Sequence, residues 1–239
     1  MVKLKELSIF FPFYNDSGTV KTQIDKAYQI GKEVAENLEV IALHGGNSKD
    51  DTYQQILEAK NHYKDLKIVD KSDNQEGYAV IKEGFKTASK EWVFYTDGDA
   101  QYNLEELPKL VQKQKETGAD VVNGYKINRK DNVLRIFFGE VYRLFSKILF
   151  SFPIRDVDCD FRLINNNILK KINLTSKDAS ILPELIVKLA LQNAKFAQIP
   201  VGHNPRIYGK SNYTVFSLAK EKLVGDLKLF WKIKFKKNI

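Results

Sequence analysis

Short apolar runs alternate with longer segments of helical periodicity through the first half of the chain. Apolar runs bounded by polar or turn residues predict buried strands, and apolar residues three and four positions apart predict helices. The expected strands are residues 7–11, 38–43, 66–69, 92–95 and 120–123, and the expected helices are residues 19–35, 52–61, 78–88 and 104–116. This alternation predicts an α/β fold with a mostly parallel sheet flanked by helices.

The pattern changes after residue 125. Residues 133–152 predict an amphipathic helix so rich in large apolar side chains that most of them are expected in the core. The segments that follow are a helix (180–192), a short strand (196–201), a polar loop (202–213) and a basic amphipathic helix (215–236). Because no repeat or Pro/Gly/Ser linker interrupts the chain, we expect one domain over residues 1–213 and a C-terminal helix over residues 214–239. That helix either belongs to the same domain or extends to a membrane surface.

The carboxyl ends of the expected strands hold the most informative polar residues. In parallel sheets of this kind, ligands bind beyond those ends. The clearest signal is Asp97-Gly98-Asp99, which follows the apolar strand at residues 92–95. Two carboxylates two positions apart can share a hard cation such as Mg²⁺ or Mn²⁺, and the cation can neutralise a diphosphate. An acidic turn without a ligand is the alternative interpretation, because Asp-Gly pairs are common in turns.

The composition excludes several classes of protein. Hydrophobic residues make up 43% and charged residues 28% of the 239 residues, which excludes collagen-like and wholly disordered chains. A single cysteine, Cys159, excludes a disulfide framework and a cysteine-rich zinc site, and it favours a reducing compartment. No stretch of about 18 uncharged apolar residues and no signal-peptide pattern is present, so a cytoplasmic location is expected.

The net charge of +8 is concentrated at the C-terminus. Residues 220–239 hold seven lysines against Glu221 and Asp226. A basic tail on a nearly balanced body favours contact with an anionic membrane surface over contact with nucleic acid. The apolar residues at helical spacing in this tail are Leu223, Leu227, Phe230 and Trp231. Their pattern alone fits a membrane-surface helix and a helix docked on the domain equally well.

Six short segments, in order along the chain, resemble the motifs of one enzyme family. They are FPFYND (11–16), HGGNSKDDT (44–52), GYAVIKEG (77–84), DGDAQ (97–101), DVDCDFR (156–162) and RIYGKS (206–211). Each segment is weak alone, but six in register over nearly the whole chain are specific. The chain resembles a family 2 glycosyltransferase of the GT-A fold, close to the dolichyl- and polyprenyl-phosphate sugar synthases. Many members of that branch continue into transmembrane helices, and none is expected in these residues.

The resemblance implies inverting transfer of a sugar from a UDP- or GDP-linked donor to a polyprenyl phosphate at the membrane surface. Asp97 and Asp99 would hold Mg²⁺ or Mn²⁺ on the donor diphosphate. The residues expected to line the nucleotide-sugar pocket are Pro12, Tyr14, Asn15, Asp16, Asp50, Lys82, Asp97 and Gly98. The residues expected at the reacting centre are Asp99, Gln101 and Asp156. A lipid phosphate is already ionised near neutral pH, so no strong general base is required.

The acceptor phosphate calls for basic side chains. Phosphate is best held by charge-assisted, preferably bidentate hydrogen bonds, which arginine supplies better than lysine. Together with the resemblance, this chemistry indicates Lys126, Arg129, Arg135, Arg162, Arg206 and Ser211. A lipid-phosphate acceptor also favours the membrane-surface interpretation of the C-terminal helix. The expected partners are therefore a nucleotide sugar, a lipid phosphate and an anionic membrane surface, without nucleic acid.

Two departures from the family pattern leave alternatives open. Gly45-Gly46 replaces a pair of acidic residues, one of which recognises the nucleotide base in the family, so the donor base stays open. Asp160 replaces a glycine and joins Asp156 and Asp158 in an acidic loop. A transferase for a sugar hydroxyl in a surface polysaccharide would need one of these three aspartates as a base. The second alternative is a membrane-associated binding protein that lost donor affinity at Gly45-Gly46.

Overall fold

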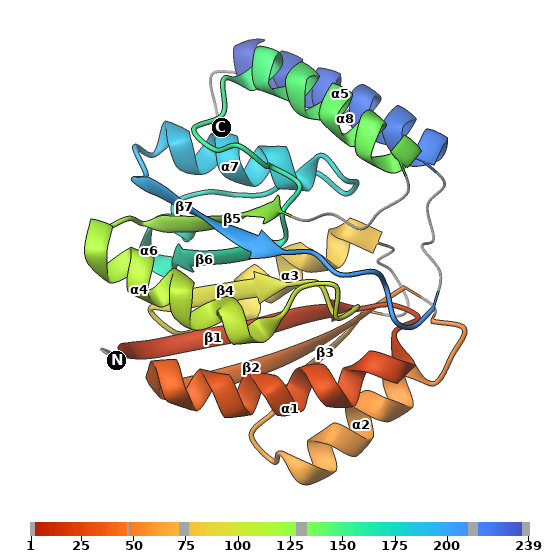
Figure 1. Cartoon of the computed structure of the whole chain (residues 1–239), viewed down its shortest axis with the longest axis vertical. Helices are drawn as coiled ribbons and strands as arrows, with labels where there is room; N and C mark the ends of the chain where they lie inside the picture. The colour runs from red at the N-terminus through yellow and green to blue at the C-terminus, as the bar shows by residue number, and fades with distance from the viewer. Residues whose placement is uncertain (1–2, 47, 72–76, 128–132, 210–214, 236–239) are drawn as a thin grey trace.

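The computed structural model describes residues 3–46, 48–71, 77–127, 133–209 and 215–235. A seven-stranded sheet runs through its centre, with helices on both faces (Figure 1). The strands are β1 (Leu4–Phe13), β2 (Ala35–Gly45), β3 (Lys67–Lys71), β4 (Trp92–Thr96), β5 (Val121–Ile127), β6 (Phe161–Asn165) and β7 (Phe196–Gly202). The helices are α1 (Ser17–Val34), α2 (Thr52–His62), α3 (Ile81–Thr87), α4 (Leu107–Thr117), α5 (Val133–Phe150), α6 (Asn166–Leu169), α7 (Ile181–Leu191) and α8 (Val215–Phe235). Two 3₁₀ turns, η1 (Gly77–Val80) and η2 (Leu104–Glu106), lead into α3 and α4.

One strand of the sheet runs against the others. The strand order is β3-β2-β1-β4-β6-β5-β7, and β6 pairs antiparallel with both β4 and β5 while the other neighbours are parallel. The predicted mostly parallel α/β sheet is confirmed, but β6 and the short α6 after it were not expected from the sequence. Because β6 is reversed, its first residue Phe161 pairs with Thr96, the last residue of β4. The loop that precedes β6 therefore lies at the carboxyl end of β4.

Alternating side chains of the strands fill two cores. Phe11 of β1 lies in the core with residues of α1, α2 and α4, and Phe10 lies in the core with residues of α3, α6 and α7. Successive residues of a strand point to opposite faces, so a strand covered on both faces must be apolar throughout. This explains why β1 reads as a continuous apolar run and was predicted correctly.

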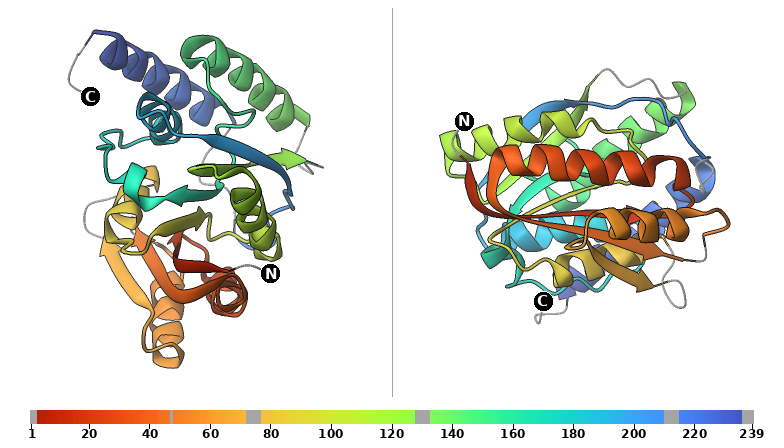
Figure 2. Two further views of the ribbon diagram at one scale, coloured as in Figure 1. Left: turned by 90° about the vertical axis from the view of Figure 1, so that its left-hand side faces the viewer. Right: turned by 90° about the horizontal axis from the view of Figure 1, so that it is seen from below.

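The expectation that the helix at residues 133–152 lies mostly in the core is wrong. Four of its large apolar side chains are between 50% and 75% exposed: Phe137, Val141, Leu144 and Ile148. Helices α5 and α8 lie side by side and form an outer layer beyond α7 (Figures 1 and 2). Their contact includes the rings of Phe150 and Phe230, whose centroids are 6.2 Å apart. Among the described residues, no helix is long and apolar enough to cross a bilayer.

A carboxylic acid, Asp226, is fully buried where α5 and α8 meet. The Tyr142 hydroxyl donates a hydrogen bond to Asp226 Oδ2 (2.8 Å). The other oxygen, Oδ1, is buried with no hydrogen-bond partner in the described part of the chain. Burial raises the pKa of Asp226 to about 7.

Replacing Asp226 by asparagine should stabilise the protein at pH 8 and have a much smaller effect at pH 4.5. An unfolded aspartate loses its proton near pH 4, whereas folded Asp226 keeps its proton up to about pH 7, so its contribution to stability falls as the pH rises through that interval. A pKa of about 7 instead of 3.8 corresponds to a cost on the order of 4 kcal/mol above pH 7. Urea unfolding of both proteins at the two pH values measures the difference.

The control for this experiment is Asp25→Asn. Burial raises the pKa of Asp25, but hydrogen bonds from Lys21 and Tyr63 outweigh that effect and hold the pKa below its usual value. The Asp25 variant should gain nothing at pH 8. An equal gain for Asp226→Asn at both pH values would show that the carboxylate is not the source of the effect.

Candidate active site

The turn at residues 97–99, directly after β4, is anchored to the end of β1. The Gly98 N–H donates to the Pro12 carbonyl oxygen (3.3 Å), and the Thr19 hydroxyl donates to the Gly98 carbonyl oxygen (2.7 Å). A Cβ at position 98 would lie 2.3 Å from the Phe13 ring and 2.8 Å from the Pro12 oxygen. Glycine at position 98 is therefore required for this close approach. The approach places the aspartates at positions 97 and 99 beside the loop that follows β1.

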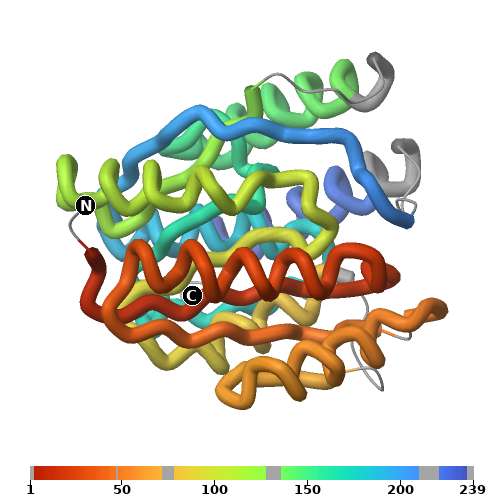
Figure 3. Tube along the Cα trace, turned by 60° about the horizontal axis from the view of Figure 1, so that its bottom comes forward, coloured from red at the N-terminus to blue at the C-terminus, as the bar shows by residue number. Residues whose placement is uncertain are grey.

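Arg206 joins two of the predicted site aspartates. Its guanidinium nitrogens lie 3.1 Å from Asp16 Oδ1 and 2.6 Å from Asp99 Oδ2. The backbone N–H of Gln101 donates to Asp99 Oδ1 (3.0 Å), and the Gln101 side chain donates to the carbonyl oxygen of Asn204 (3.0 Å). Asp16 follows β1, Asp99 follows β4 and Arg206 follows β7, and Figure 3 shows the chain after β7 ending beside the start of α1. Three segments distant in the sequence thus build one site.

Four aspartates at this edge, which we call the carboxylate cluster, repel one another: Asp16, Asp97, Asp99 and Asp160. Burial, and then the charges of Asp160 and Asp99, raise the pKa of Asp97 well above its usual value. Burial raises the pKa of Asp16 to about 6, although the Tyr14 N–H and Arg206 act in the opposite direction. The Tyr95 hydroxyl donates a hydrogen bond to Asp160. The carboxylate cluster therefore favours the binding of additional positive charge.

The chemistry of the cluster fits a hard divalent cation. Asp97 and Asp99 offer carboxylate oxygens, the ligands that Mg²⁺ and Mn²⁺ prefer, and a cation would relieve the repulsion that raises the pKa of Asp97. In the described part of the chain, no three His, Cys, Asp or Glu side chains are grouped to hold a metal by themselves. A metal held by these two aspartates would therefore need further oxygens from a ligand and from water, which is the usual behaviour of Mg²⁺ at phosphates.

Two predicted nucleotide-pocket residues hold the loops after β1 and β2 together. Asn15, at a left-handed φ of 55°, accepts a hydrogen bond from the Lys49 N–H (2.6 Å) through its side-chain oxygen. Asp50 accepts hydrogen bonds from the Ser17 N–H (3.0 Å) and from the Thr52 hydroxyl (2.5 Å). Burial raises the pKa of Asp50, but these hydrogen bonds outweigh it and keep the pKa below its usual value. Asn15 and Asp50 thus give this part of the site its shape.

The glycine that replaces the family's acidic residue has a packing reason. A Cβ at Gly45 would lie 3.0 to 3.2 Å from side-chain atoms of Val80 in η1, so an aspartate there would require Val80 to shift by a few tenths of an ångström. Lys82, a predicted pocket residue, lies just beyond η1 on α3. The charges that act most strongly on Lys82 are those of Lys177, Lys86 and Glu184. The structure therefore places Lys82 on the α7 side of the sheet and does not bring it into the carboxylate cluster.

The loop at residues 156–160 brings Asp156 and Lys126 together. Asp156 accepts hydrogen bonds from the backbone N–H groups of Lys126 (3.2 Å) and Asp158 (3.1 Å). Lys126 Nζ donates to the Asp158 carbonyl oxygen (2.6 Å) and lies 3.7 Å from Asp156 Oδ2. Both predicted residues are therefore held in place beside the end of β5. Their roles in catalysis and acceptor binding stay predictions.

The structure corrects the prediction that Arg162 binds the acceptor phosphate. The side chain is fully buried, its Nε donates to the Cys159 carbonyl oxygen (3.0 Å), and one terminal nitrogen donates to the Val157 carbonyl oxygen. Because β6 turns this side chain into the protein, Arg162 holds the 156–160 loop and is not exposed at the surface of the site; its nitrogen Nη1 is buried with no hydrogen-bond partner in the described part of the chain. Arg129 and Ser211 lie outside the described residues, as does the side chain of Arg135.

Two residues of the site region were not predicted. Tyr95 lies at the end of β4 and donates to Asp160, and Lys222 of α8 lies 2.5 Å from Asp158 Oδ2. Tyr95 is the penultimate residue of the buried strand β4, and a hydroxyl at that position is only a weak sequence signal of a site residue. No local signal connects Lys222 with Asp158, because 64 positions separate them.

A family model and solved structures agree with this architecture. The model described as glycosyl transferase family 2 matches residues 8–172, more than half of the chain. The fold resembles glucosyl-3-phosphoglycerate synthase from Mycobacterium tuberculosis, solved with Mn²⁺, UDP and glucosyl-3-phosphoglycerate, with a TM-score of 0.70, 15% identity, and coverage of 94% of this chain and 79% of that chain. The fold also resembles a mannosyltransferase from Pyrobaculum calidifontis that was solved with GDP-Man and Mn²⁺. The TM-score is 0.68 and the identity 18%, and the match covers 97% of this chain and 65% of that chain. The predicted GT-A fold is confirmed.

The chain belongs to glycosyl transferase family 2, and it is a glycosyltransferase. Among curated proteins it is similar to an undecaprenyl-phosphate 4-deoxy-4-formamido-L-arabinose transferase from Yersinia pestis (strain Pestoides F). The two are 26% identical over 226 residues, which is 94% of this chain and 67% of the relative. The protein of that name from Photorhabdus laumondii is 24% identical over 225 residues, with the same coverage. The predicted resemblance to the polyprenyl-phosphate branch of the family is thereby confirmed.

Proposed function

We propose that this glycosyltransferase moves a sugar from a nucleoside diphosphate sugar to a polyprenyl phosphate at the cytoplasmic face of a membrane. The observation that carries the proposal is the carboxylate cluster bridged by Arg206 at the carboxyl edge of the sheet. Acidic side chains suit a metal on the donor diphosphate, and a guanidinium suits a second phosphate. The names of the curated relatives support a polyprenyl phosphate as the acceptor.

On the donor side, the loops after β1, β2 and β4 would receive the nucleotide sugar. Asp97 and Asp99 would hold Mg²⁺ or Mn²⁺, which when bound supplies neutralisation of the charge that develops on the leaving diphosphate. Tyr14, Asn15 and Asp16 would line the nucleotide. Val80 crowds the Cβ position of Gly45, and with glycine there in place of the family's acidic residue this chain would select its base, uracil or guanine, with other groups.

On the acceptor side, Arg206 and Lys126 would bind the lipid phosphate. Arg206 spans Asp16 and Asp99, whereas Lys126 stands beside Asp156. The phosphate oxygen would attack the sugar directly and invert the anomeric centre. Because the phosphate is already ionised, Asp156 would orient the reactants and is not required as a proton acceptor.

The proposed reaction is tested with purified protein and a panel of UDP- and GDP-sugars. Undecaprenyl phosphate in anionic vesicles is the expected acceptor, and an oligosaccharide with free hydroxyls is the competing one. We expect transfer to the lipid phosphate that requires Mg²⁺ or Mn²⁺ and is lost with EDTA. Transfer to the oligosaccharide alone would favour a polysaccharide transferase. Nucleotide binding without transfer to either acceptor would favour the alternative that the chain is a membrane-associated binding protein.

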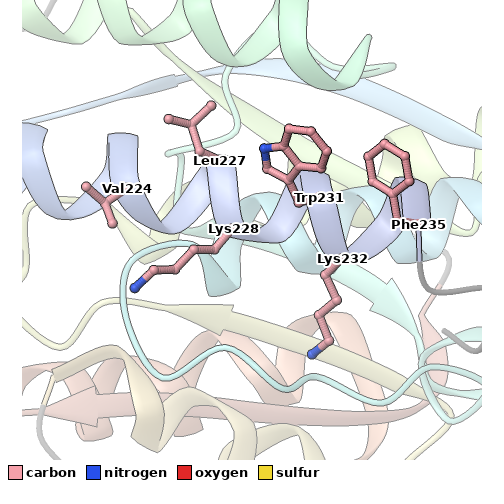
Figure 4. Close-up of a pocket in the computed structure, with 6 residues that line it drawn as sticks. All are labelled: Val224, Leu227, Lys228, Trp231, Lys232 and Phe235. Carbon is pink, nitrogen blue, oxygen red and sulfur yellow. The ribbon is translucent and has the colours of Figure 1, made fainter.

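The exposed apolar side chains of α5 and α8 form a second part of the proposal, a surface that we call the docking face. Its residues are Phe137, Val141, Leu144, Ile148, Leu223, Val224, Leu227, Trp231 and Phe235. Figure 4 shows Leu227, Trp231 and Phe235 pointing to one side of α8 and Lys228 and Lys232 pointing to the other, and all five line one pocket along this helix. Aromatic and aliphatic side chains beside lysines suit an anionic bilayer surface, where each lysine contributes about 1 kcal/mol.

Replacing Ile148 and Trp231 together by serine should lower the affinity for anionic vesicles by about tenfold or more. Both side chains are already at least 60% exposed, so the double variant loses apolar insertion without losing core packing. Co-sedimentation with vesicles over a salt series measures the affinity. Leu191→Ser, an exposed apolar residue of α7 outside the docking face, is the matched control and should bind normally. Unchanged binding of the double variant would exclude the docking face as the membrane contact.

A further inference from the structure

One ion pair connects helix α8, which carries part of the docking face, with the loop at residues 156–160. Lys222 Nζ of α8 lies 2.5 Å from Asp158 Oδ2, and only 9% of the lysine side chain is exposed. Neither residue belongs to the carboxylate cluster. The pair therefore joins the outer helix layer to the loop that holds Lys126 and Asp156 on the acceptor side of the site.

The 156–160 loop links the Lys222–Asp158 ion pair to the two acceptor-side residues, Lys126 and Asp156, through hydrogen bonds. The Asp158 carbonyl oxygen accepts a hydrogen bond from Lys126 Nζ (2.6 Å), and the Asp158 N–H donates to Asp156 Oδ1 (3.1 Å). The N–H of Lys126 donates to Asp156 Oδ2 (3.2 Å). Lys126 and Asp156 thus depend on the position of one residue, Asp158, whose side chain is held by Lys222.

At its other end, Lys222 is held in the seam between the two outer helices. Its Nζ lies 4.5 Å from the centre of the Tyr142 ring on α5, and the Tyr142 hydroxyl donates to Asp226 on α8. A movement of α5 and α8 against the rest of the protein would therefore move Lys222 with them. Largely buried ion pairs contribute little net stability, because desolvation of both charges offsets their attraction. The Lys222–Asp158 pair is thus better suited to setting a geometry than to stabilising the fold.

We propose that Lys222 is a positioning residue that couples the docking face to acceptor use. Contact of α5 and α8 with a bilayer sets the position of Lys222, and through Asp158 this sets Lys126 and Asp156 for the lipid phosphate. The inference rests on the proposed function for its acceptor. In this role Lys222 contacts neither the donor nor the metal.

The test compares Lys222→Met, which keeps most of the length of the side chain and removes its charge, with Lys222→Arg. We expect Lys222→Met to raise the KM for undecaprenyl phosphate in anionic vesicles by about tenfold. Its KM for the nucleotide sugar and its affinity for vesicles should stay within about twofold of the wild type, a split that a general structural defect would not give. Lys222→Arg should restore most of the acceptor KM. Lys115→Met, an exposed lysine of α4, controls for loss of one positive charge.

Two further measurements keep the outcome decisive. The double variant Lys222→Met/Asp158→Asn should be no worse than either single variant, because both remove the same coupling. Hydrogen exchange of the 156–160 amides should slow when vesicles are added to the wild type and should not respond in Lys222→Met. Equal rises of both KM values, additive effects in the double variant, or a vesicle response that survives in Lys222→Met would overturn the coupling. If the wild type does not glycosylate the lipid phosphate, the proposed function fails, and the hydrogen-exchange comparison still decides the coupling.

Discussion

Asp99→Asn should lower the rate of sugar transfer by about a hundredfold or more, the largest effect expected of any single substitution in this protein. The asparagine keeps the shape of the side chain and can still accept the hydrogen bond from the Gln101 N–H. It removes one of the two charges available for a metal and the charged partner of Arg206. Asp97→Asn should follow closely, because Asp97 is the other expected ligand.

Calorimetry of UDP and GDP binding, with and without Mn²⁺, locates the defect. Metal-dependent affinity should fall in both variants, while any metal-independent affinity should stay. Asp65→Asn is the control, since Asp65 is an exposed aspartate that accepts a hydrogen bond from Tyr28 outside the site. If both Asp97→Asn and Asp99→Asn keep the metal dependence of the wild type, the metal assignment is wrong.

Arg206→Ala should raise the KM for the lipid phosphate by about tenfold or more, and the KM for the nucleotide sugar by much less. A charge-assisted hydrogen bond to a phosphate is worth about 1.5 to 3 kcal/mol, which corresponds to roughly tenfold to a hundredfold. In this structure the guanidinium pairs with Asp16 and Asp99. A divalent cation held by Asp99 would take the place of the guanidinium there, which would leave Arg206 available for the acceptor.

The pH profile of Arg206→Ala supplies an independent check. Burial raises the pKa of Asp16 to about 6, and Arg206 opposes that rise. Without Arg206 the pKa of Asp16 in the free enzyme should be higher, so kcat/KM of the variant should fall at a higher pH than that of the wild type as the solution is acidified. Steady-state kinetics with donor and acceptor varied separately decide between the roles. A defect confined to the donor would assign Arg206 to the diphosphate, and Arg206→Lys should retain partial acceptor affinity because it keeps the charge without the bidentate geometry.

The local sequence pattern was sufficient for the elements whose environment it reports directly. Strands β1, β2 and β4 are covered on both faces, so their apolar runs had no competing interpretation. The 97–99 turn follows such a strand, so the sequence alone predicts its aspartates at the ligand-binding edge of the sheet. The order of six motifs along the chain was likewise enough to indicate the family.

Tertiary structure decided everything that depends on a distant partner. Amphipathicity predicted α5 as a helix, but whether its apolar face is covered depends on α8, which packs on one side of it and leaves Phe137 and Ile148 exposed. The basic character of Arg162 indicated a phosphate ligand, yet the reversed strand β6 turns it into the core. The bridge from Arg206 to Asp16 spans 190 positions, and Lys222 meets Asp158 across 64. Charge and periodicity are local properties of the chain, whereas pairing and burial arise only when the sheet brings remote segments to one edge.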